Sequence, residues 1–296
     1  GSPVARLIEL MTLGTGAALP SLERFTAAHL LRDWLGNVVL LDAGEGVQHR
    51  LRQAGISPTK VDFIAITHGH GDHINGLPGL LQTMYLSGRT SKLTIIAPKY
   101  LEDYLKSVIE VEGSEKAFQV NLVSITGDKG SYVISVKGRD RLELRWFRTC
   151  HSVESYGFVL EWVLGPRLAR PVYSAEEAKK LMETGEDVIV PAPLRVAYTG
   201  DTSPCENVIE SVRGVDVLIH EATFDSTMEA EAAKFGHSTS VDAARVAKEA
   251  GVRKLILTHV STRYEGYEAK ALEEEARQVF PDTVLAWDLA RFALKA

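Results

Sequence analysis

Six short apolar runs recur along this chain, and each is followed by a histidine or an aspartate. The runs are too short for helices and are rich in Val, Ile and Leu, which is typical of buried strands. They cover residues 38–41, 61–67, 142–150, 194–200, 215–219 and 254–258, and the residues that follow them are Asp42, His68, His151, Asp201, His220 and His259. Loops at strand ends direct side chains into a shared crevice of an open α/β sheet. We therefore expect one site assembled from most of the chain.

Helical patterns alternate with these runs, at residues 77–86, 241–250 and 269–280. The second pattern follows Ser240, the N-cap that we expect, and stops at Gly251, a residue type that commonly ends helices. Strands that alternate with helices predict an α/β fold. The 296 residues suit one large domain of this class or two small ones. Because no repeat or Gly/Ser linker marks a boundary, we expect a single domain over residues 3–296.

The composition is that of a globular protein, with 45% hydrophobic and 24% charged residues. No stretch approaches the roughly 18–20 apolar residues of a membrane span, and the first residues lack the apolar run of a signal peptide. We therefore expect no membrane partner. Gly1 and Ser2 resemble the remnant of a cleaved tag and are excluded from the fold prediction.

The two cysteines, Cys150 and Cys205, are too few for the disulfide framework of a small secreted protein. They favour a reducing, cytoplasmic setting. The chain also contains only four Asn and five Gln, a scarcity that leans toward a thermophile. Because intracellular proteins of hyperthermophiles do carry disulfides, a bond between the two cysteines stays open.

A cluster of metal-ligand residue types occupies residues 67–76, which read T-H-G-H-G-D-H-I-N-G. In an extended segment His68 and His70 lie two positions apart, so their rings fall on the same side. Asp72 and His73 follow a glycine and point elsewhere. One tetrahedral ion cannot take all four and still leave room for the residues at the other strand ends.

Two ions can share seven ligands if one carboxylate bridges them, and Asp201 is the natural bridge. One ion would be held by His68, His70 and His151, and the other by Asp72, His73 and His259. Imidazole-rich ligation favours two Zn²⁺ per chain, and a bridging carboxylate also admits Mn²⁺ or Fe.

A pair of metals about 3.5–4 Å apart suits displacement at a phosphodiester, because both the attacking and the leaving oxygens are stabilised. Zinc lowers the pKa of bound water to roughly 7, so a hydroxide that bridges the ions can attack at neutral pH. Asp72 is placed to orient that hydroxide or to take its proton.

The cluster resembles the signature of the metallo-β-lactamase superfamily, and further motifs resemble its ribonuclease Z branch, the tRNA 3′-processing endonucleases. These motifs are L-G-T-G-A-A-L-P at 13–20, L-L-D-A-G-E-G-V-Q-H at 40–49, H-G-H-G-D-H-I-N-G-L-P-G at 68–79, Y-T-G-D-T at 198–202, H-E-A-T-F at 220–224, G-H-S-T-S at 236–240 and H-V-S-T-R-Y at 259–264. The resemblance implies an αββα sandwich, two zinc ions and a homodimer. It also implies cleavage of the 3′ trailer from precursor tRNA after the discriminator base, leaving a 3′-hydroxyl on the tRNA.

The resemblance also implies roles for individual residues. The first zinc site matches His68, His70, His151 and Asp201, and the second matches Asp72, His73, Asp201 and His259. Glu221 and His237 correspond to the proton-donating pair of the family, and expulsion of an RNA 3′-oxygen needs such a general acid. We expect Asp42, His49 and His220 to support the ligands, and Arg263 to meet a phosphate or to form a surface ion pair.

A short arm is expected at residues 163–192, where family members with a tRNA-binding arm insert it. Gly165-Pro166, flanked by Arg167 and Arg170, resembles a short version of that arm. Residues 163–194 contain four basic and five acidic side chains, so we expect only the tip to grip the tRNA backbone. The loop at 20–26 matches only part of the pattern by which some bacterial members treat an encoded CCA end.

Other functions fit parts of the sequence. The net charge of −6 and the short arm favour a small-molecule or cyclic-nucleotide phosphodiesterase of the same superfamily. The motifs at 220–224, 236–240 and 259–264 favour the ribonuclease. A β-lactamase or a thioesterase leaves the Glu221–His237 pair unexplained. A non-enzymatic scaffold predicts damaged ligands, whereas all seven are intact.

Overall fold

Two seven-stranded sheets form the centre of the computed structural model, which describes residues 6–113 and 116–296. Gly1 and Ser2 lie outside the described residues. In spatial order the first sheet consists of β16 (Ala290–Lys295), β1 (Leu7–Gly14), β2 (Ala28–Arg32), β3 (Val38–Leu41), β4 (Phe63–Ala65), β5 (Leu93–Pro98) and β6 (Val120–Ile125). The second consists of β15 (Thr283–Leu285), β14 (Lys254–Thr258), β13 (Val217–Glu221), β12 (Leu194–Tyr198), β9 (Tyr156–Val163), β8 (Asp140–Arg148) and β7 (Lys129–Lys137).

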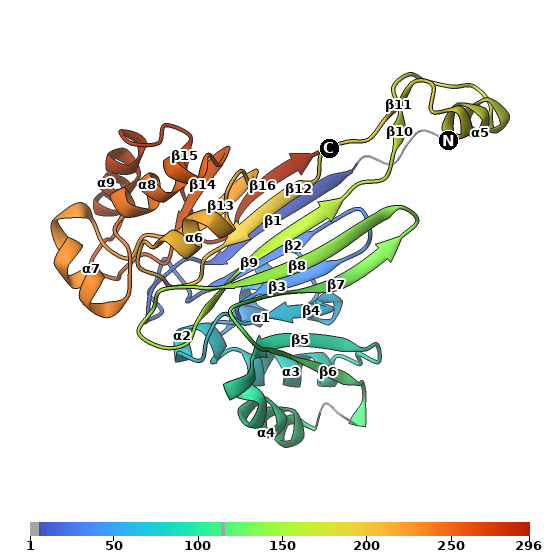
Figure 1. Ribbon diagram of the computed structural model, residues 1–296. Coiled ribbons are helices and arrows are strands. Elements are labelled where there is room, and N and C mark those ends of the chain that lie inside the picture. The colour runs from blue at the N-terminus through green and yellow to red at the C-terminus, as the bar shows by residue number, and fades with distance from the viewer. Residues whose placement is uncertain (1–5, 114–115) are drawn as a thin grey trace.

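Helices cover the outer face of each sheet, as Figure 1 shows. Between the strands of the first sheet the chain forms α1 (Val47–Gln53), α2 (Gly71–Ile74), α3 (Leu77–Leu86) and α4 (Glu102–Glu112). The second is accompanied by α6 (Glu206–Ser211), α7 (Glu229–Phe235), α8 (Ser240–Ala250) and α9 (Tyr267–Arg277). These four layers confirm the predicted αββα sandwich.

Three apolar clusters separate the layers. One lies between the sheets and includes Phe158, Trp162 and Ile219. The other two join each sheet to its helices, with Leu80 of α3 in one and Leu272 of α9 in the other. Burial of each such side chain stabilises the fold by about 1.5–3 kcal/mol. The apolar residues of each element therefore determine which of its faces is buried.

Most of the strands that carry the candidate ligands run parallel to at least one neighbour in their sheet. The exception is β8, which precedes His151 and is antiparallel to both β7 and β9. β3, β4, β5 and β6 pair in parallel, and so do β12, β13, β14 and β15. The carboxyl ends of parallel neighbours meet at one edge of a sheet, so the loops that follow β3, β4, β12 and β14 open close together. This topology positions the site.

Two local expectations are wrong. His220 lies inside β13 instead of after it. The N-cap of α8 is Thr239 and not Ser240, because the Thr239 hydroxyl accepts from the Asp242 N–H at 3.0 Å while the Asp242 carboxylate accepts from the Thr239 N–H at 2.9 Å. This reciprocal capping box satisfies two backbone donors, which Ser240 would leave to water.

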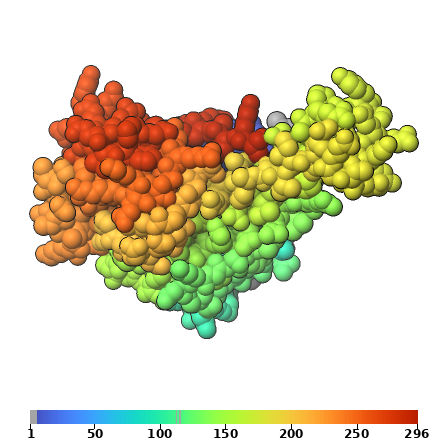
Figure 2. Space-filling model, turned by 45° about the horizontal axis from the view of Figure 1, so that its top comes forward, coloured from blue at the N-terminus to red at the C-terminus, as the bar shows by residue number. Residues whose placement is uncertain are grey.

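Residues between β9 and β12 form a small projection, the arm. β10 (Arg167–Leu168) pairs with β11 (Val188–Ile189), and α5 (Ala175–Thr184) lies between them in the chain. Figure 2 shows the arm, in yellow-green, standing clear of the body. Among the described residues, no helix has the length and apolar character that crossing a bilayer would require.

The two cysteines form a disulfide. Cys150 precedes His151 after β8, and Cys205 precedes α6, so the bond joins segments 55 positions apart in the sequence. It settles the pairing that the sequence left open.

Candidate metal centre

Seven side chains from four loops converge in two overlapping groups. The first contains His68, His70, His151 and Asp201, and the second contains Asp72, His73, Asp201 and His259. In each group the candidate ligand atoms all lie within 4.8 Å of one another. These are the two sets that the sequence predicts, and Asp201 belongs to both.

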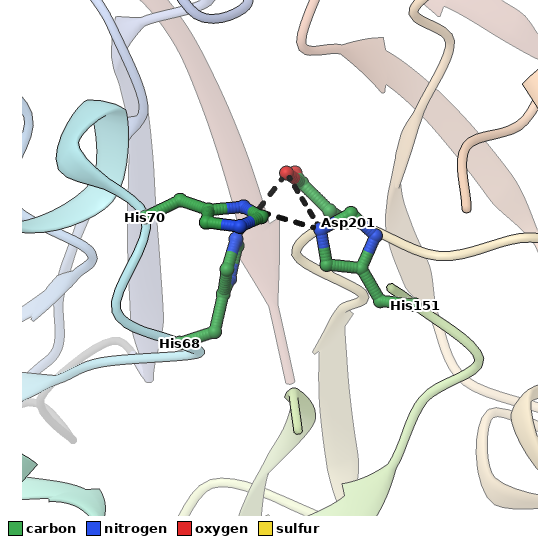
Figure 3. Close-up of side chains that lie close together, drawn as sticks. All are labelled: His68, His70, His151 and Asp201. Carbon is green, nitrogen blue, oxygen red and sulfur yellow. Dashed lines mark hydrogen bonds and ion pairs between the residues drawn. The ribbon is translucent and has the colours of Figure 1, made fainter. Parts of the chain in front are cut away.

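The first group gathers at one carboxylate oxygen, as Figure 3 shows. Oδ2 of Asp201 lies 3.4 Å from Nε2 of His68 and 3.7 Å from Nε2 of His151. The His151 Nε2 atom is also 3.4 Å from Nδ1 of His70. Three imidazole nitrogens and one carboxylate oxygen therefore face a common point.

The second group gathers at the other oxygen of the same carboxylate. Oδ1 of Asp201 lies 3.2 Å from Nε2 of both His73 and His259. Oδ2 of Asp72 lies 3.4 Å from His73 Nε2 and 3.1 Å from His259 Nε2. Asp201 thus turns one oxygen to each group, which is the arrangement that a carboxylate shared by two ions requires.

The donor set fits a pair of divalent cations. The His68 Nε2, His73 Nε2 and Asp201 Oδ1 atoms are buried without a hydrogen-bond partner in the described chain, although such atoms are normally satisfied. Burial alone would lower the pKa of His73, yet the charges of Asp201 and Asp42 raise it well above its ordinary value. The cluster therefore favours positive charge at its centre, which bound metal ions would supply.

Asp42 supports His73 from behind. Its Oδ2 atom lies 2.6 Å from His73 Nδ1 and accepts from the hydroxyls of Tyr198 at 2.8 Å and Thr67 at 2.9 Å. A partner on Nδ1 directs Nε2 toward the metal position and fixes the ring. Asp42 has a φ of 61°, a left-handed conformation that costs a non-glycine residue about 1–2 kcal/mol.

Similar contacts orient the other rings. Nδ1 of His259 lies 2.9 Å from the Thr223 hydroxyl, and Nδ1 of His151 lies 2.7 Å from the Gly236 carbonyl oxygen. Gly236 has a φ of 73°, and a Cβ there would lie 2.9 Å from His151 Nδ1, so a side chain would displace the ring. Sequence reasoning missed these supports, although Thr223 and Gly236 belong to the quoted motifs.

Tyr100 links two of the three loops that carry the first group. Its hydroxyl accepts from the Gly69 N–H at 3.0 Å and donates to the Glu154 carbonyl oxygen at 2.9 Å. Gly69 separates His68 from His70, and a Cβ on it would lie 2.8 Å from Leu101. The glycine is therefore needed because the neighbouring side chains leave no room.

The buried Glu221 and the half-buried His237 form a pair beside the second group. Oε1 of Glu221 lies 2.8 Å from His237 Nδ1, and Oε2 accepts from the Thr223 hydroxyl at 2.6 Å and from the Ser238 N–H at 3.1 Å. These bonds occupy the carboxylate, so it orients His237 instead of serving as a metal ligand. His237 lines the cavity, and Nε2 is the nitrogen left to meet a substrate.

Two expected support residues lie elsewhere. His49 is exposed, because Val47 and Leu51 form the buried side of α1 and His49 points away from them. The expectation of a buried support is therefore wrong for His49. His220 is buried, but its Nδ1 atom lies 2.7 Å from the Glu221 carbonyl oxygen instead of a metal-type side chain.

The candidate substrate residues lie outside the cavity. The guanidinium of the exposed Arg263 contacts the Met228 sulfur at 2.8 Å. Gly165 is not at the tip of the arm: it is buried at its base, where its N–H donates to Asp140 and its carbonyl accepts from Arg6.

The other three candidate residues of the arm follow Gly165 in the chain. Pro166 is next in the chain and is half-buried, and Arg167 is exposed in β10. Arg170 is exposed, and its guanidinium is 2.7 Å from Asp187 and 3.3 Å from Glu177. These two carboxylates of the arm thus neutralise part of the charge of Arg170.

A cavity of about 360 Å³ opens over both metal groups. Five of the seven candidate ligands line it: His70, Asp72, His151, Asp201 and His259. Residues 17–19, 223–224 and 261–262 line the rest, together with Ser152, Phe235 and His237. This volume admits a nucleotide-sized group, although a whole RNA would have to contact the surface outside it.

The chain is similar to other proteins along nearly its whole length. The family model described as Anti-Pycsar protein Apyc1 matches residues 8–275. A ribonuclease Z of Aeropyrum pernix is 45% identical over 95% of this chain and 96% of its own. The crystal structure of the short form of human tRNase Z has a TM-score of 0.71 at 27% identity, covering 96% of this chain and 98% of that one.

The fold is also shared with a more distant protein. The metallo-β-lactamase fold protein YhfI of Bacillus subtilis has a TM-score of 0.73 at 20% identity, covering 98% of this chain and 100% of that one. A likeness at this identity concerns the fold alone. Together with the four layers described above, it establishes the metallo-β-lactamase fold.

Proposed function

We propose that this chain, which belongs to the ribonuclease Z family, removes the 3′ trailer from precursor tRNA. Its residues 8–275 also belong to the family described as Anti-Pycsar protein Apyc1. The cut falls after the discriminator base and leaves a 3′-hydroxyl on the tRNA. The observation that carries this proposal is Asp201, which presents one oxygen to each of two candidate ligand groups beside the Glu221–His237 pair. A dinuclear site with a proton donor suits cleavage of an RNA phosphodiester that leaves a 3′-hydroxyl, because it can activate a water molecule and protonate the leaving 3′-oxygen.

Two Zn²⁺ ions are the cofactors that we propose, held by the two groups with Asp201 between them. Bound there, they would activate a water molecule and neutralise charge on the phosphodiester. The preponderance of imidazole donors supports zinc, and Mn²⁺ or Fe would also suit the shared carboxylate.

Asp72 would orient the attacking water. Its Oδ2 atom accepts from the Ala18 N–H at 3.1 Å, and its carboxylate lines the cavity. His237 would act on the opposite part of the reaction, where the 3′-oxygen of the discriminator nucleotide leaves and needs a proton. The bond between Nδ1 and Glu221 leaves Nε2 to donate that proton.

The test is incubation of zinc-loaded protein with a precursor tRNA that carries a 3′ trailer, followed by mapping of the ends. We expect one cut after the discriminator, sensitive to chelator. The Asp72→Asn variant should leave the precursor intact while retaining its fold by circular dichroism. Turnover of small diesters or cyclic nucleotides, without any cut in precursor tRNA, would instead support the phosphodiesterase alternative.

We also propose that the enzyme works in the cytoplasm as a homodimer. The small number of cysteines supports the first statement, and the resemblance to the ribonuclease Z family supports the second. Light scattering of the purified protein tests the second: a mass of one 32.5 kDa chain at micromolar concentration would contradict it.

A further inference from the structure

The lip of the cavity over the metal groups is apolar. Phe235, the last residue of α7, is 52% exposed, and Leu19, on the loop after β1, is 63% exposed. Phe224 continues this lip, with its ring centre 6.3 Å from that of His237. Among the described residues that line the cavity, none is Lys or Arg. A nucleic acid that enters the cavity therefore meets apolar surface next to the metal groups.

We propose that Phe235 is the stacking surface for the discriminator base, the unpaired nucleobase on the 5′ side of the cleaved bond. This inference rests on the proposed function and names the part of the substrate that the apolar lip receives. Single-stranded RNA is generally recognised through unstacked bases that lie on aromatic side chains. Phe235 is the most exposed aromatic side chain that lines the cavity.

The chain geometry links Phe235 to one particular nucleotide. Phe235 is followed directly by Gly236, whose carbonyl oxygen binds the ring of His151, and by His237, whose ring binds Glu221. The loop is thus held at both residues that follow the aromatic ring. Since His237 donates its proton to the 3′-oxygen of the discriminator nucleotide, the base of that same nucleotide lies within reach of the ring two residues earlier.

The charge next to the ring suits a nucleotide. The Lys234 ammonium lies 5.5 Å from the centre of the Phe235 ring, within the distance of a cation–π contact. Lys234 is exposed, so its charge is available to the sugar–phosphate backbone beside a stacked base. An apolar ring beside one cation matches a base joined to a phosphate.

The test uses a spectroscopic signal and kinetics. Zinc-loaded Asp72→Asn protein is titrated with a precursor tRNA that carries 2-aminopurine at the discriminator position, because stacking quenches this fluorophore. We expect quenching that is lost when Phe235→Ala is added. A second substitution, Tyr267→Ala, serves as the control, because Tyr267 is an aromatic residue 90% exposed on α9, outside the cavity.

In the active protein, Phe235→Ala should raise KM for precursor tRNA about 10-fold, the usual effect of losing one base–aromatic stack. Phe235→Trp should restore it. On a precursor that is abasic at the discriminator, wild-type protein and Phe235→Ala should have equal KM, because the contact is absent from both. Zinc content should stay at the wild-type level in each variant.

Quenching that persists in Phe235→Ala would overturn the inference, and so would a KM increase that remains on the abasic precursor. In either case, cleavage of precursor tRNA by the wild-type protein would still support the proposed function. Absence of any wild-type cut in precursor tRNA would overturn both. The two failures are therefore distinguishable.

Discussion

The Nδ1 atom of His237 lies 2.8 Å from Oε1 of Glu221, a carboxylate with no solvent exposure. Burial would lower the pKa of His237, but the charge of Glu221 and the bond to it outweigh burial and raise that pKa to about 9. The imidazole is therefore protonated at neutral pH. This is the state that a proton donor to a leaving oxygen needs before the reaction.

Glu221→Gln should move the alkaline limb of the pH–rate profile to lower pH. The variant keeps a hydrogen-bonding side chain but removes the charge, so burial would dominate and the pKa of His237 would fall. A general acid loses activity as the pH rises through its pKa, so the rate of the variant should begin to fall at a lower pH than the rate of the wild type. Zinc analysis of the variant is the control, and an unmoved limb would remove Glu221 from this role.

His237→Ala should slow cleavage of precursor tRNA by about 10²–10⁴-fold, the usual contribution of a general acid. It should affect bis(p-nitrophenyl) phosphate much less, because p-nitrophenolate leaves without being protonated. The measurement is the ratio of kcat on the two substrates, with zinc content as the control. Equal losses on both substrates would indicate damage to the metal groups instead of loss of a proton donor.

The sequence predicts the ligand sets because metal binding restricts residue types so strongly. His68, His151 and Asp201 are recognisable as histidines and an aspartate that follow apolar runs. β8 and β12, which precede His151 and Asp201, run in the same direction on either side of the antiparallel β9, so both residues open at one edge of the second sheet. Which side of a short helix is buried is harder to predict from the sequence. His49 lies near the motif in sequence, but Val47 and Leu51 determine which side of α1 is buried.

Supporting contacts could not be predicted in the same way. The Tyr198 hydroxyl donates to Asp42 across 156 positions, and Tyr100 reaches Gly69 across 31. The first pair depends on how the two sheets pack, and the second on how the segments after β4 and β5 lie against each other. Neither tyrosine carries a local signal for its partner. The disulfide stayed open for the same reason, since only the fold brings Cys150 and Cys205 together.

Asp201→Ala should empty both metal positions. The residue offers one oxygen to each group, so its loss removes a ligand from both at once. Zinc per chain after gel filtration, measured by mass spectrometry, should fall from two to below one. The matched control is His49→Ala, which removes an exposed histidine and should keep the wild-type content. Two ions retained by Asp201→Ala would rule out the shared carboxylate.

Replacing Cys150 and Cys205 by serine should lower the free energy of unfolding by about 2–4 kcal/mol, the usual effect of losing a disulfide. The bond closes a loop with a sequence separation of 55, so it restricts the unfolded chain substantially. Denaturant unfolding of the metal-free protein measures the difference. A reducing agent should destabilise the wild-type protein and leave the double variant unchanged. Equal stability of both proteins without reductant would contradict a disulfide in solution.

Arg167→Ala should flatten the salt dependence of tRNA binding more than Arg170→Ala does. Arg167 is exposed on the arm, whereas the guanidinium of Arg170 is 2.7 Å from Asp187 and already shares its charge. Loss of one phosphate contact lowers the slope of log K against log salt by about 0.7–0.9. Binding to the Asp72→Asn protein between low and moderate salt measures this slope without cleavage. A slope unaltered by Arg167→Ala and by the double variant would show that the arm does not grip the tRNA backbone through these residues.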